Sequence, residues 1–512
     1  MYLGNFVKFT HILFIAILSI QCYRIETPTE HYRPNIHFTS LKNWINDPNG
    51  LIFVDGIFHL YFQHNPFGNN WGSMSWGHAI SKDLFQWKEL PVAMKEDGFF
   101  FYPKMKFSGS IVLDKNNSSG LCHNSKECMI AIFTEWTLLN QTQNISISND
   151  SGLSFQEYEK NPIIQERSFS FRDPKVFWHE AMSRFVMVVS RPSKQKLEIY
   201  TSKNLKSWNK ESEITEVDFR DGIWECPDLF FLTEEKNSEI GKWVLLISVA
   251  ETKRGSYMKY LLGNFDGKKF EKDKNFSKSK ILDHGFDFYA AISWENLPNN
   301  ERTIIGWMNN WEYANHLPTF PWKGAMSLPR KLILRKIHNE YILAQVPREE
   351  IENYKTSRKK LNPIQLNNNS KSIPLVDDSF ELKFTLTKHS SKKSGVKIEN
   401  ENESFVIDID FVNHSISFDR STIQNPMYSN YQKLNHSKFN FSRNNEEFDF
   451  KIIFDKSSIE VFFLNGEVVI TNLVFPKNKL TKLTFYSKEG TSQFQDTTLD
   501  FFRKIEKINS LK

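Results

Sequence analysis

The chain has 512 residues, a net charge of +5 and only four cysteines. This length exceeds what one hydrophobic core usually holds, so two domains are the default expectation. The small net charge, with no dense basic cluster, argues against a nucleic-acid-binding protein.

Residues 1–22 have the pattern of a secretory signal peptide. Lys8 precedes a short apolar core at residues 12–18, which is too short for a membrane span. Cleavage near Cys22 is expected, although Ile20 and Gln21 make a poor small-residue site. No later stretch is long and apolar enough to cross a bilayer. The sequence therefore predicts a secreted, extracellular protein with no membrane association once the signal is removed.

Two features bear on an oxidising compartment. Cys122 and Cys128 flank a polar turn and are either a small disulfide or two free thiols. In a secreted eukaryotic protein some of the glycosylation sequons would be used, although an Asn-rich composition produces some by chance. The sequons begin at Asn116, Asn117, Asn140, Asn144, Asn149, Asn275, Asn368, Asn402, Asn413, Asn435 and Asn440.

The segment 44–50 places a carboxylate on a rigid bend directly before a strand. Pro48 fixes its own φ and excludes Asp47 from the helical region, and Asn49-Gly50 tolerates positive φ. The apolar run 51–54 follows at once. An isolated turn of this composition is usually an ordinary loop, so the interpretation depends on the rest of the chain.

From about residue 44 to residue 312 the chain repeats itself. Five apolar runs, at 51–54, 110–113, 175–178, 229–232 and 290–294, each precede a second run, at 58–63, 129–133, 185–190, 243–249 and 303–307. After four of the second runs comes a polar turn that ends in an aromatic residue. Self-similar blocks of strands with this period indicate a β-propeller, and five blocks indicate five blades.

The predicted fold is all-β, with the five-bladed propeller at residues 30–338 followed by a C-terminal β-sandwich at 373–512. The charged, Asn- and Lys-rich stretch 339–372 is interpreted as a linker, with a short helix near 348–354. Strands resume at 380–386, 405–411, 450–454, 459–463, 467–471 and 482–486, and Asn465-Gly466 predicts a hairpin turn.

If the first strand of each blade lines a central channel, the residues that open those strands meet at one mouth. Asp47, Asp173 and Glu225 open three of them, each in a turn that contains proline. Like charges gathered in one cavity push pKa values apart, which separates acid and base roles. Paired carboxylates are the equipment for glycoside hydrolysis, and nearby aromatic side chains offer flat faces to sugars.

Ten short motifs, spread over the predicted propeller and sandwich, together resemble one known family. They lie at 43–50, 61–66, 71–78, 107–110, 171–174, 224–228, 287–290, 306–311, 322–330 and 455–462. Together they resemble glycoside hydrolase family 32, the invertases, exo-inulinases and levanases, over residues 37–501. The departures from the family pattern are small. Ile45 stands where the family usually has Met, and Tyr61-Phe62-Gln63 stands where the family more often has Phe-Tyr-Gln. The resemblance implies the same propeller and sandwich that the strand pattern predicts.

The resemblance also implies roles for individual residues. Asp47 resembles the nucleophile that forms a fructosyl-enzyme ester, Glu225 the general acid and then base, and Asp173 the group that stabilises the transition state. Cys226 resembles a residue that tunes the acid, and the alternative interpretation is a small buried hydrophobe. The expected substrate contacts are Asn46, Gln63, Trp71, Phe107, Ser108, Arg172, Cys226, Tyr289 and Trp311.

The predicted activity is that of a retaining, exo-acting β-fructofuranosidase on sucrose, and the spelling of residues 306–326 favours fructans such as inulin and levan as well. No cofactor and no metal are expected, because no His/Cys cluster has ligand spacing. A fructosyltransferase of the same family and a non-catalytic sugar-binding propeller are the alternatives. The presence of all three acids argues against the second. The sequence does not indicate an oligomeric state.

Overall fold

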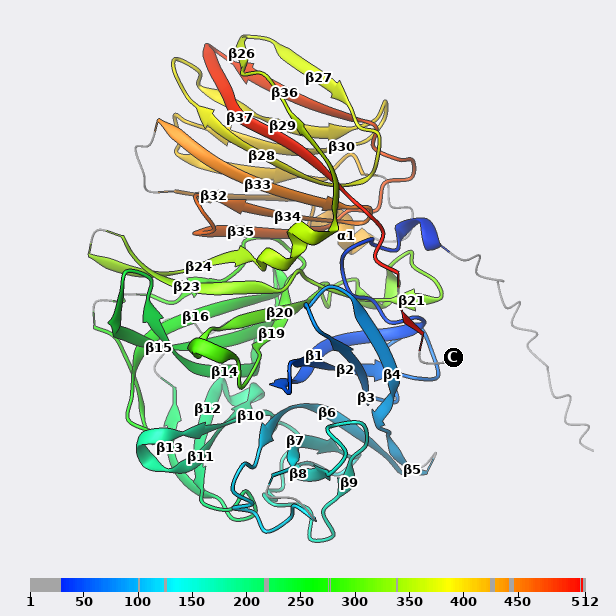
Figure 1. Cartoon of the computed structure of the whole chain (residues 1–512), viewed down its shortest axis with the longest axis vertical. Helices are drawn as coiled ribbons and strands as arrows, with labels where there is room; N and C mark the ends of the chain where they lie inside the picture. Colours follow the sequence, from blue (N-terminus) through cyan, green and yellow to red (C-terminus); the bar gives the residue numbers. More distant parts are fainter. Residues whose placement is uncertain are drawn as a thin grey trace, which may run out of the picture.

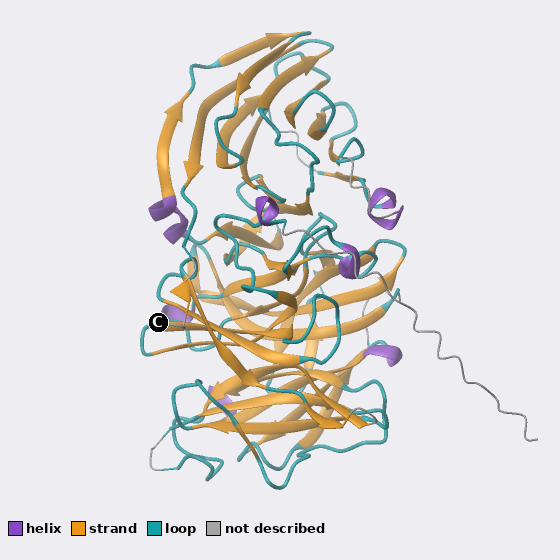
Figure 2. Ribbon diagram, turned by 90° about the vertical axis from the view of Figure 1, so that its right-hand side faces the viewer, coloured by secondary structure: helices purple, strands orange, loops and turns teal. Residues whose placement is uncertain are grey.

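The computed structural model describes residues 29–99, 102–123, 127–215, 221–274, 276, 278–337, 339–423, 429–441, 446–506 and 508–509. The predicted signal peptide and the sequon residue Asn275 lie outside these ranges. Strands dominate, and the only helices among the described residues are short (Figure 2). They are η1 (Glu30–Tyr32), η2 (Glu180–Met182), η3 (Pro192–Lys194), η4 (Pro298–Asn300), η5 (Ala314–His316), η6 (Glu349–Tyr354) and α1 (Ser429–Lys433).

Four-stranded antiparallel blades form the lower part of the molecule in Figure 1. Blade 1 is β1 (Asn43–Val54), β2 (Ile57–Asn65), β3 (Ser75–Ser81) and β4 (Trp87–Met94). Blade 2 is β6 (Tyr102–Leu113), β7 (Met129–Trp136), β8 (Gln141–Ser148) and β9 (Gln156–Glu157), with β5 (Asp97–Phe99) paired to β6. Blade 3 is β10 (Arg172–His179), β11 (Arg184–Arg191), β12 (Lys196–Ser202) and β13 (Asn209–Ile214).

The last two blades share one sheet. Blade 4 is β14 (Ile223–Glu234), β15 (Asn237–Thr252), β16 (Gly255–Phe265) and β17 (Phe270–Lys272), with β18 (Lys280–Ile281) beside β16. Blade 5 is β19 (Tyr289–Ser293), β20 (Thr303–Met308), β23 (Arg330–Ile337) and β24 (Glu340–Pro347), with β22 (Ala325–Met326) beside β20. The five predicted inner runs lie in β1, β6, β10, β14 and β19, so the five-bladed prediction is confirmed.

Backbone pairing closes the ring of blades. β21 (Trp322–Lys323), which comes from the chain of blade 5, pairs in parallel with the start of β1, where Trp44 faces Lys323. A second parallel bridge joins Ile52 to Glu295. The first and last blades are therefore joined by hydrogen bonds on both sides of the β1 bend.

The polar turn seen in four of the sequence repeats is an Asx turn. In each copy a side-chain oxygen accepts hydrogen bonds from backbone N–H groups that follow it. The four acceptors are Asp83, Asp150, Asn204 and Asp266. Each lies between the third and fourth strands of its blade, so the repeated spelling marks the outer edge of blades 1 to 4.

The upper part of the molecule is a sandwich of two antiparallel sheets (Figure 1). One sheet has β25 (Lys355–Lys360), β37 (Thr491–Phe502), β28 (Ser379–Thr387), β33 (Glu447–Asp455), β34 (Ser458–Phe463) and β35 (Val468–Leu473), with β26 (Ile364–Asn367) beside β37. The other has β27 (Ser370–Pro374), β36 (Lys482–Lys488), β29 (Lys393–Glu399), β30 (Ser404–Asp410), β31 (Ser415–Asp419) and β32 (His436–Asn440). The sandwich prediction is confirmed.

Several segments have more structure than the sequence indicated. The stretch 339–372, interpreted as a linker, contains β24, η6, β25 and β26 and the start of β27. The chain therefore passes from propeller to sandwich through paired strands and one short 3-10 helix. After β37 the chain returns to the propeller, where β38 (Ile508–Asn509) pairs with β4.

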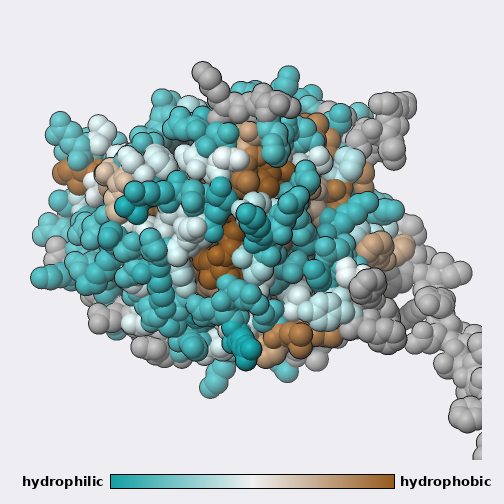
Figure 3. Space-filling view, turned by 90° about the horizontal axis from the view of Figure 1, so that it is seen from below, coloured by the Kyte–Doolittle hydropathy of each residue, from teal (hydrophilic) through white to brown (hydrophobic). Residues whose placement is uncertain are grey.

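Cys122 and Cys128 are joined by a disulfide in the turn after β6, whereas Cys226 is free and buried. No helix within the described residues is long and apolar enough to span a membrane. The face of the molecule seen in Figure 3 is mainly hydrophilic, with small separate hydrophobic patches. This surface resembles that of ordinary water-exposed proteins, in which single apolar side chains are normal.

The two domains are packed together through apolar and charged groups. Ile453, Phe462 and Val469 of the sandwich are buried in one cluster with Ile36 and Phe38 of the propeller. A second cluster joins the chain around Met308 to Phe475. The interface is therefore built like a continuous core, not like a flexible contact.

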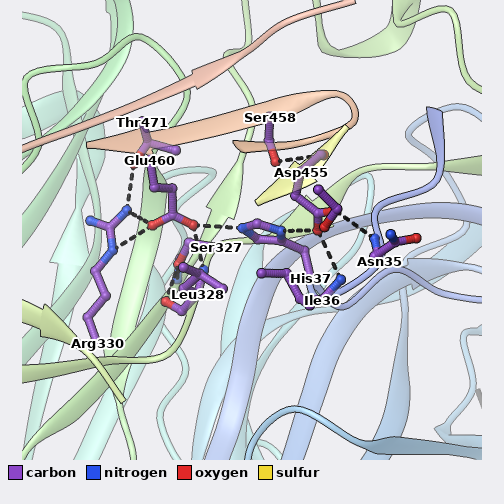
Figure 4. Close-up of polar contacts among 12 residues, drawn as sticks. Asn35, Ile36, His37, Ser327, Leu328, Arg330, Asp455, Ser458, Glu460 and Thr471 are labelled. Carbon is purple, nitrogen blue, oxygen red and sulfur yellow. Dashed lines mark hydrogen bonds and ion pairs between the residues drawn. The ribbon is translucent and has the colours of Figure 1, made fainter. Parts of the chain in front are cut away.

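His37 lies at the centre of a buried ionic network in this interface (Figure 4). Its Nδ1 is 2.8 Å from Asp455 Oδ2 and its Nε2 is 2.9 Å from Glu460 Oε1. Glu460 also receives the guanidinium of Arg330, which pairs with Asp283 as well. Burial alone would lower the pKa of His37, but the two carboxylates outweigh burial and raise the pKa to about 9.

His37→Gln should weaken the domain interface in a pH-dependent way. The pKa of His37 lies above its unfolded value of about 6.5, so its contribution to stability is complete below that pH and is lost as the pH rises through 9. We expect the variant to melt about 2–5 °C lower at pH 6 and the difference to shrink by pH 9.5. Differential scanning calorimetry at both pH values measures this, and a difference independent of pH would contradict it.

Candidate active site

The innermost strand of every blade is interrupted at the same level by a β-bulge. Pairing shifts between Ile45 and Pro48, Lys106 and Gly109, Arg172 and Lys175, Glu225 and Asp228, and Tyr289 and Ile292. In each case two residues of the inner strand face one residue of the second strand. A bulge bends its strand and re-aims its side chains, so five bulges direct five sets of side chains toward one axis.

The bulges of blades 3 to 5 share a strained backbone. Their first residues, Asp173, Cys226 and Ala290, have φ of 65°, 44° and 52°, in the left-handed region. Such conformations are costly for residues with a Cβ and cluster at functional sites. Glu225 directly precedes its bulge, so it matches Arg172 and Tyr289 in register and not Asp173. The three acids open equivalent inner strands but occupy successive positions on them: Glu225 precedes its bulge, Asp173 is the first bulge residue and Asp47 is the second.

Asp47 is held by three donors at the bottom of the funnel. Ser108 Oγ donates to Oδ2 at 2.7 Å, Asn46 Nδ2 donates to Oδ1 at 3.1 Å, and the Cys226 thiol lies 3.4 Å from Oδ2. Trp44 fixes the Asn46 amide by donating to its oxygen. Burial raises the pKa of Asp47, and the charge of Glu225 adds to this, although Ser108 acts in the opposite direction.

Asp173 lies beside Asp47 on the other side of the Cys226 thiol. Its Oδ2 accepts the Cys226 backbone N–H at 3.1 Å and lies 3.7 Å from the Cys226 sulfur. Burial raises the pKa of Asp173 to about 7 against the opposing charge of Arg172. Burial and these carboxylates also raise the pKa of the Cys226 thiol well above its ordinary value. Cys226 is therefore a neutral donor that separates two acids.

Glu225 is oriented from two sides. Arg172 donates to Oε1 through Nη2 at 2.6 Å and Nε at 3.0 Å, and Tyr289 donates its hydroxyl to Oε2 at 2.5 Å. Charge-assisted hydrogen bonds of this kind fix a carboxylate in direction as well as in position. The Glu225 carboxylate is therefore aimed at the cavity by its neighbours in blades 3 and 5.

These residues surround a cavity of about 540 Å³, within the range of small-molecule sites. It is lined by Asn46, Asp47, Gln63, Trp71, Phe107, Ser108, Trp136, Arg172, Asp173, Ile223, Glu225, Ala250, Glu251, Gly255, Trp311 and Glu312. Trp71 is 40% exposed at the rim, where its ring meets Phe107 edge-on. Phe107 in turn stacks on Trp136, so one side of the cavity is an aromatic wall.

All the predicted site residues meet here, although two do not line the cavity. Cys226 and Tyr289 lie behind its wall, where they position Asp47, Asp173 and Glu225. Sequence reasoning missed Trp136, Ile223, Ala250, Glu251, Gly255 and Glu312. Trp136 ends β7, where it pairs with Met105 before the blade 2 bulge, and the sequence alone does not reveal this position. Glu251 lies near the end of β15, where the pairing with β16 is irregular between Val249 and Thr252, and the sequence gives no signal for this position.

One group of carboxylates in the described part of the chain has spacing suited to a metal: Asp97, Glu135 and Glu157. The Lys106 ammonium lies among them, in contact with Glu157 and 3.3 Å from Glu135. Lys106 precedes the blade 2 bulge, and its carbonyl accepts a hydrogen bond from Gln63 at 2.9 Å. This cluster is an ion-pair network, and its members Lys106 and Glu135 directly precede Phe107 and Trp136 of the aromatic wall.

A five-bladed propeller whose funnel collects several carboxylates, one guanidinium and an aromatic wall defines a carbohydrate-active enzyme of the glycoside hydrolase class. Residues 37–347 match the family model described as the glycosyl hydrolases family 32 N-terminal domain, and residues 349–500 match that of the family 32 C terminal. The chain belongs to glycosyl hydrolase family 32 and is a glycoside hydrolase.

Relatives support this assignment over most of the chain. A levanase from Bacillus subtilis is 37% identical, over 93% of this chain and 71% of the levanase. The extracellular exo-inulinase inuE from Aspergillus niger is 35% identical, over 90% of this chain and 93% of its own. The structure of a β-fructofuranosidase from Schwanniomyces occidentalis complexed with fructosyl-erythritol superposes with a TM-score of 0.86 at 30% identity, covering 94% of this chain and 99% of that one.

Asp173→Asn should stabilise the protein at neutral pH. The pKa of about 7 exceeds the unfolded value of about 4, so the folded state keeps a proton that the unfolded state loses. The contribution of Asp173 to stability is therefore full below pH 4 and is lost as the pH rises through 7. We expect the variant to melt about 2 °C higher than the wild type at pH 8, with little difference at pH 4.

Differential scanning calorimetry at pH 8 and pH 4 measures these melting temperatures. Asp410→Asn is the matched control. Hydrogen bonds from Asn413 lower the pKa of Asp410 even though burial opposes them. Its contribution to stability has the opposite pH dependence, so this variant should melt lower than the wild type at pH 8. Equal shifts at both pH values for Asp173→Asn would show that Asp173 does not titrate as described.

Proposed function

We propose that the chain is a retaining, exo-acting β-fructofuranosidase that hydrolyses terminal non-reducing β-D-fructofuranosyl residues of sucrose and of fructans such as inulin and levan. The observation that carries this proposal is that the buried Asp47 carboxylate and the Glu225 carboxylate line the same cavity. The names of the relatives, levanase and exo-inulinase, support the substrate class.

In the first step Asp47 attacks the anomeric carbon of the bound fructosyl group while Glu225 donates a proton to the departing oxygen. The carbon–oxygen bond to the leaving sugar breaks, and an ester forms between fructose and Asp47. Glu225 then takes a proton from water, which attacks the same carbon and restores the Asp47 carboxylate. Two displacements at one carbon retain its configuration.

The surroundings of each acid suit its role. Ser108 and Asn46 orient Asp47 by donating one hydrogen bond to each oxygen. Asp173 lies beside Asp47, where its oxygens can accept hydroxyl groups of the fructosyl ring and stabilise developing positive charge. Arg172 forms an ion pair with Glu225, and its Nε lies 3.9 Å from Asp173 Oδ2. A sugar hydroxyl can therefore replace part of the contact between Arg172 and Asp173.

The floor of the funnel supports exo attack. Below the acids, Lys175 Nζ lies 2.8 Å from Glu295 and 3.3 Å from Asp228, and it is buried. The Ser110 hydroxyl joins the neighbouring inner strands of blades 2 and 3 by donating to Pro174. Packing of this kind in the channel favours entry of a chain end over the middle of a polymer.

We propose an extracellular location, which the predicted signal peptide and the extracellular exo-inulinase relative support.

Asp47→Asn should lower kcat/KM on sucrose by about 10³-fold or more, because the amide cannot form the ester. Rapid acid quenching of the wild type during turnover, followed by peptide mass spectrometry, should find the fructosyl adduct on the peptide that contains Asp47. Asp114→Asn is the control, since Asp114 is a buried aspartate of the same propeller that caps the turn at Ser118 and Ser119. An adduct on another residue would refute the nucleophile assignment.

The stereochemistry and pattern of products test the rest of the proposal. NMR during the first minutes of sucrose hydrolysis should show the β anomer of fructose before mutarotation. Inulin and levan should release free fructose from the start, as chromatography can resolve. Initial α-fructose or internal oligosaccharides would contradict the retaining exo mechanism, and early trisaccharides from sucrose would show a fructosyltransferase instead.

A further inference from the structure

The segment Asp287-Phe288-Tyr289 connects the active site to the domain interface. Tyr289, at the start of β19, donates its hydroxyl to Glu225 Oε2 at 2.5 Å. Asp287, two residues earlier, is fully buried against the sandwich. Tyr289 can hold Glu225 in place only if the backbone that carries it is itself held.

That backbone is held from both domains. Its carbonyls at residues 284–286 accept hydrogen bonds from Arg254 and Asn310 of the propeller, and its N–H groups donate to the sandwich. The His284 N–H donates to the Val469 carbonyl at 2.8 Å, and the Asp287 N–H donates to the Thr471 carbonyl at 3.1 Å. The Phe286 N–H donates to the Asn472 side chain at 3.2 Å. Residues 284–287 therefore run along β35. The segment that directly precedes β19 is hydrogen-bonded to the sandwich.

The Arg420 side chain holds Asp287 against the sandwich. It follows β31 of the sandwich, is 1% exposed, and uses all five of its N–H donors. Nη1 donates to Asp287 Oδ2 at 2.7 Å and to the Leu473 carbonyl at 2.6 Å. Nη2 donates to the Tyr313 hydroxyl at 2.9 Å, and Nη2 and Nε both donate to the Leu434 carbonyl. No simpler side chain reproduces this planar set of contacts.

Asp287 is satisfied on both oxygens by the same group of residues. Its Oδ2 accepts from Arg420 and from the Leu473 N–H at 2.8 Å, and its Oδ1 accepts from the Tyr313 hydroxyl. Tyr313 is two residues after Trp311, which lines the cavity. The Arg420 guanidinium thus fixes one side chain on each of the two chain segments of blade 5 that reach the active site.

We propose that Arg420 of the sandwich is a positioning residue for the proposed acid/base Glu225, acting through Asp287 and Tyr289. This inference rests on the function proposed above. The Arg420–Asp287 pair fixes the backbone of residue 287, the short path to Tyr289 transmits that position, and the tyrosine hydroxyl sets the direction of the Glu225 carboxylate. A displacement of about 1 Å in an acid/base group costs on the order of 10²-fold in rate.

Two variants test the proposal by weakening the contacts between Arg420, Asp287 and Tyr313 in different ways. Arg420→Lys keeps the charge and loses the planar fork, and Tyr313→Phe removes one hydroxyl without changing any charge. The comparison uses kcat/KM on sucrose and on an aryl β-D-fructofuranoside with a p-nitrophenolate leaving group. kcat/KM reports the step that forms the ester, and p-nitrophenolate leaves without a proton from the acid.

We expect each variant to lower kcat/KM on sucrose by about 10-fold or more and on the aryl substrate by less than about 3-fold. His37→Gln is the control, because it disturbs the same interface without contacting residues 287–289, and it should lower both values equally or not at all. Equal losses on both substrates in Arg420→Lys and Tyr313→Phe, or no loss on either, would overturn the positioning role. A wild type that hydrolyses neither substrate would refute the proposed function itself.

Discussion

The central constraint on this structure is that several acidic side chains of like charge lie close together in one largely buried cavity. Among the described residues that line the cavity, Arg172 is the cation that faces Asp47, Asp173, Glu225, Glu251 and Glu312. One guanidinium does not offset this charge, and burial raises the pKa of both Asp47 and Asp173. The ionised forms that the proposed chemistry needs are therefore unfavourable for folding. The surrounding fold must supply enough stability elsewhere to tolerate them.

One backbone device brings the acids together. A strand that kept regular pairing through the centre of the propeller would alternate its side chains between the two faces of its blade. The bulge in each inner strand breaks that alternation and turns two neighbouring residues toward the axis. Hence Asn46 and Asp47 both act at the site, and Arg172 contacts Glu225 while Asp173 contacts Cys226. Positive φ at Asp173 and Cys226 is part of the same arrangement.

The sequence was sufficient for the architecture and for most of the site, because both follow from short-range patterns. Repeated apolar runs predicted the blades, and turns with proline marked the positions of Asp47, Asp173 and Glu225. Predictions failed where long-range pairing decides the structure. The stretch 339–372 is polar, but its strands are completed by partners such as β37, more than one hundred residues later. Glu251 reaches the cavity from an irregularly paired position near the end of β15, and no local sequence pattern encodes that irregularity.

Long-range pairing also gives the sandwich a part in building the active site. The inner strands of blades 1 to 4 each pair with the second strand of their own blade. The chain leading into β19 instead donates its backbone N–H groups to β35 of the sandwich. Removing the Arg420 guanidinium while the sandwich stays in place would leave Asp287 as a buried carboxylate without its cation, a cost of several kcal/mol. Buried ionic networks are weak sources of stability but strong constraints on geometry. Here the constraint falls on the backbone two residues from the tyrosine that orients Glu225, so the second domain contributes to the precision of the site without touching the cavity.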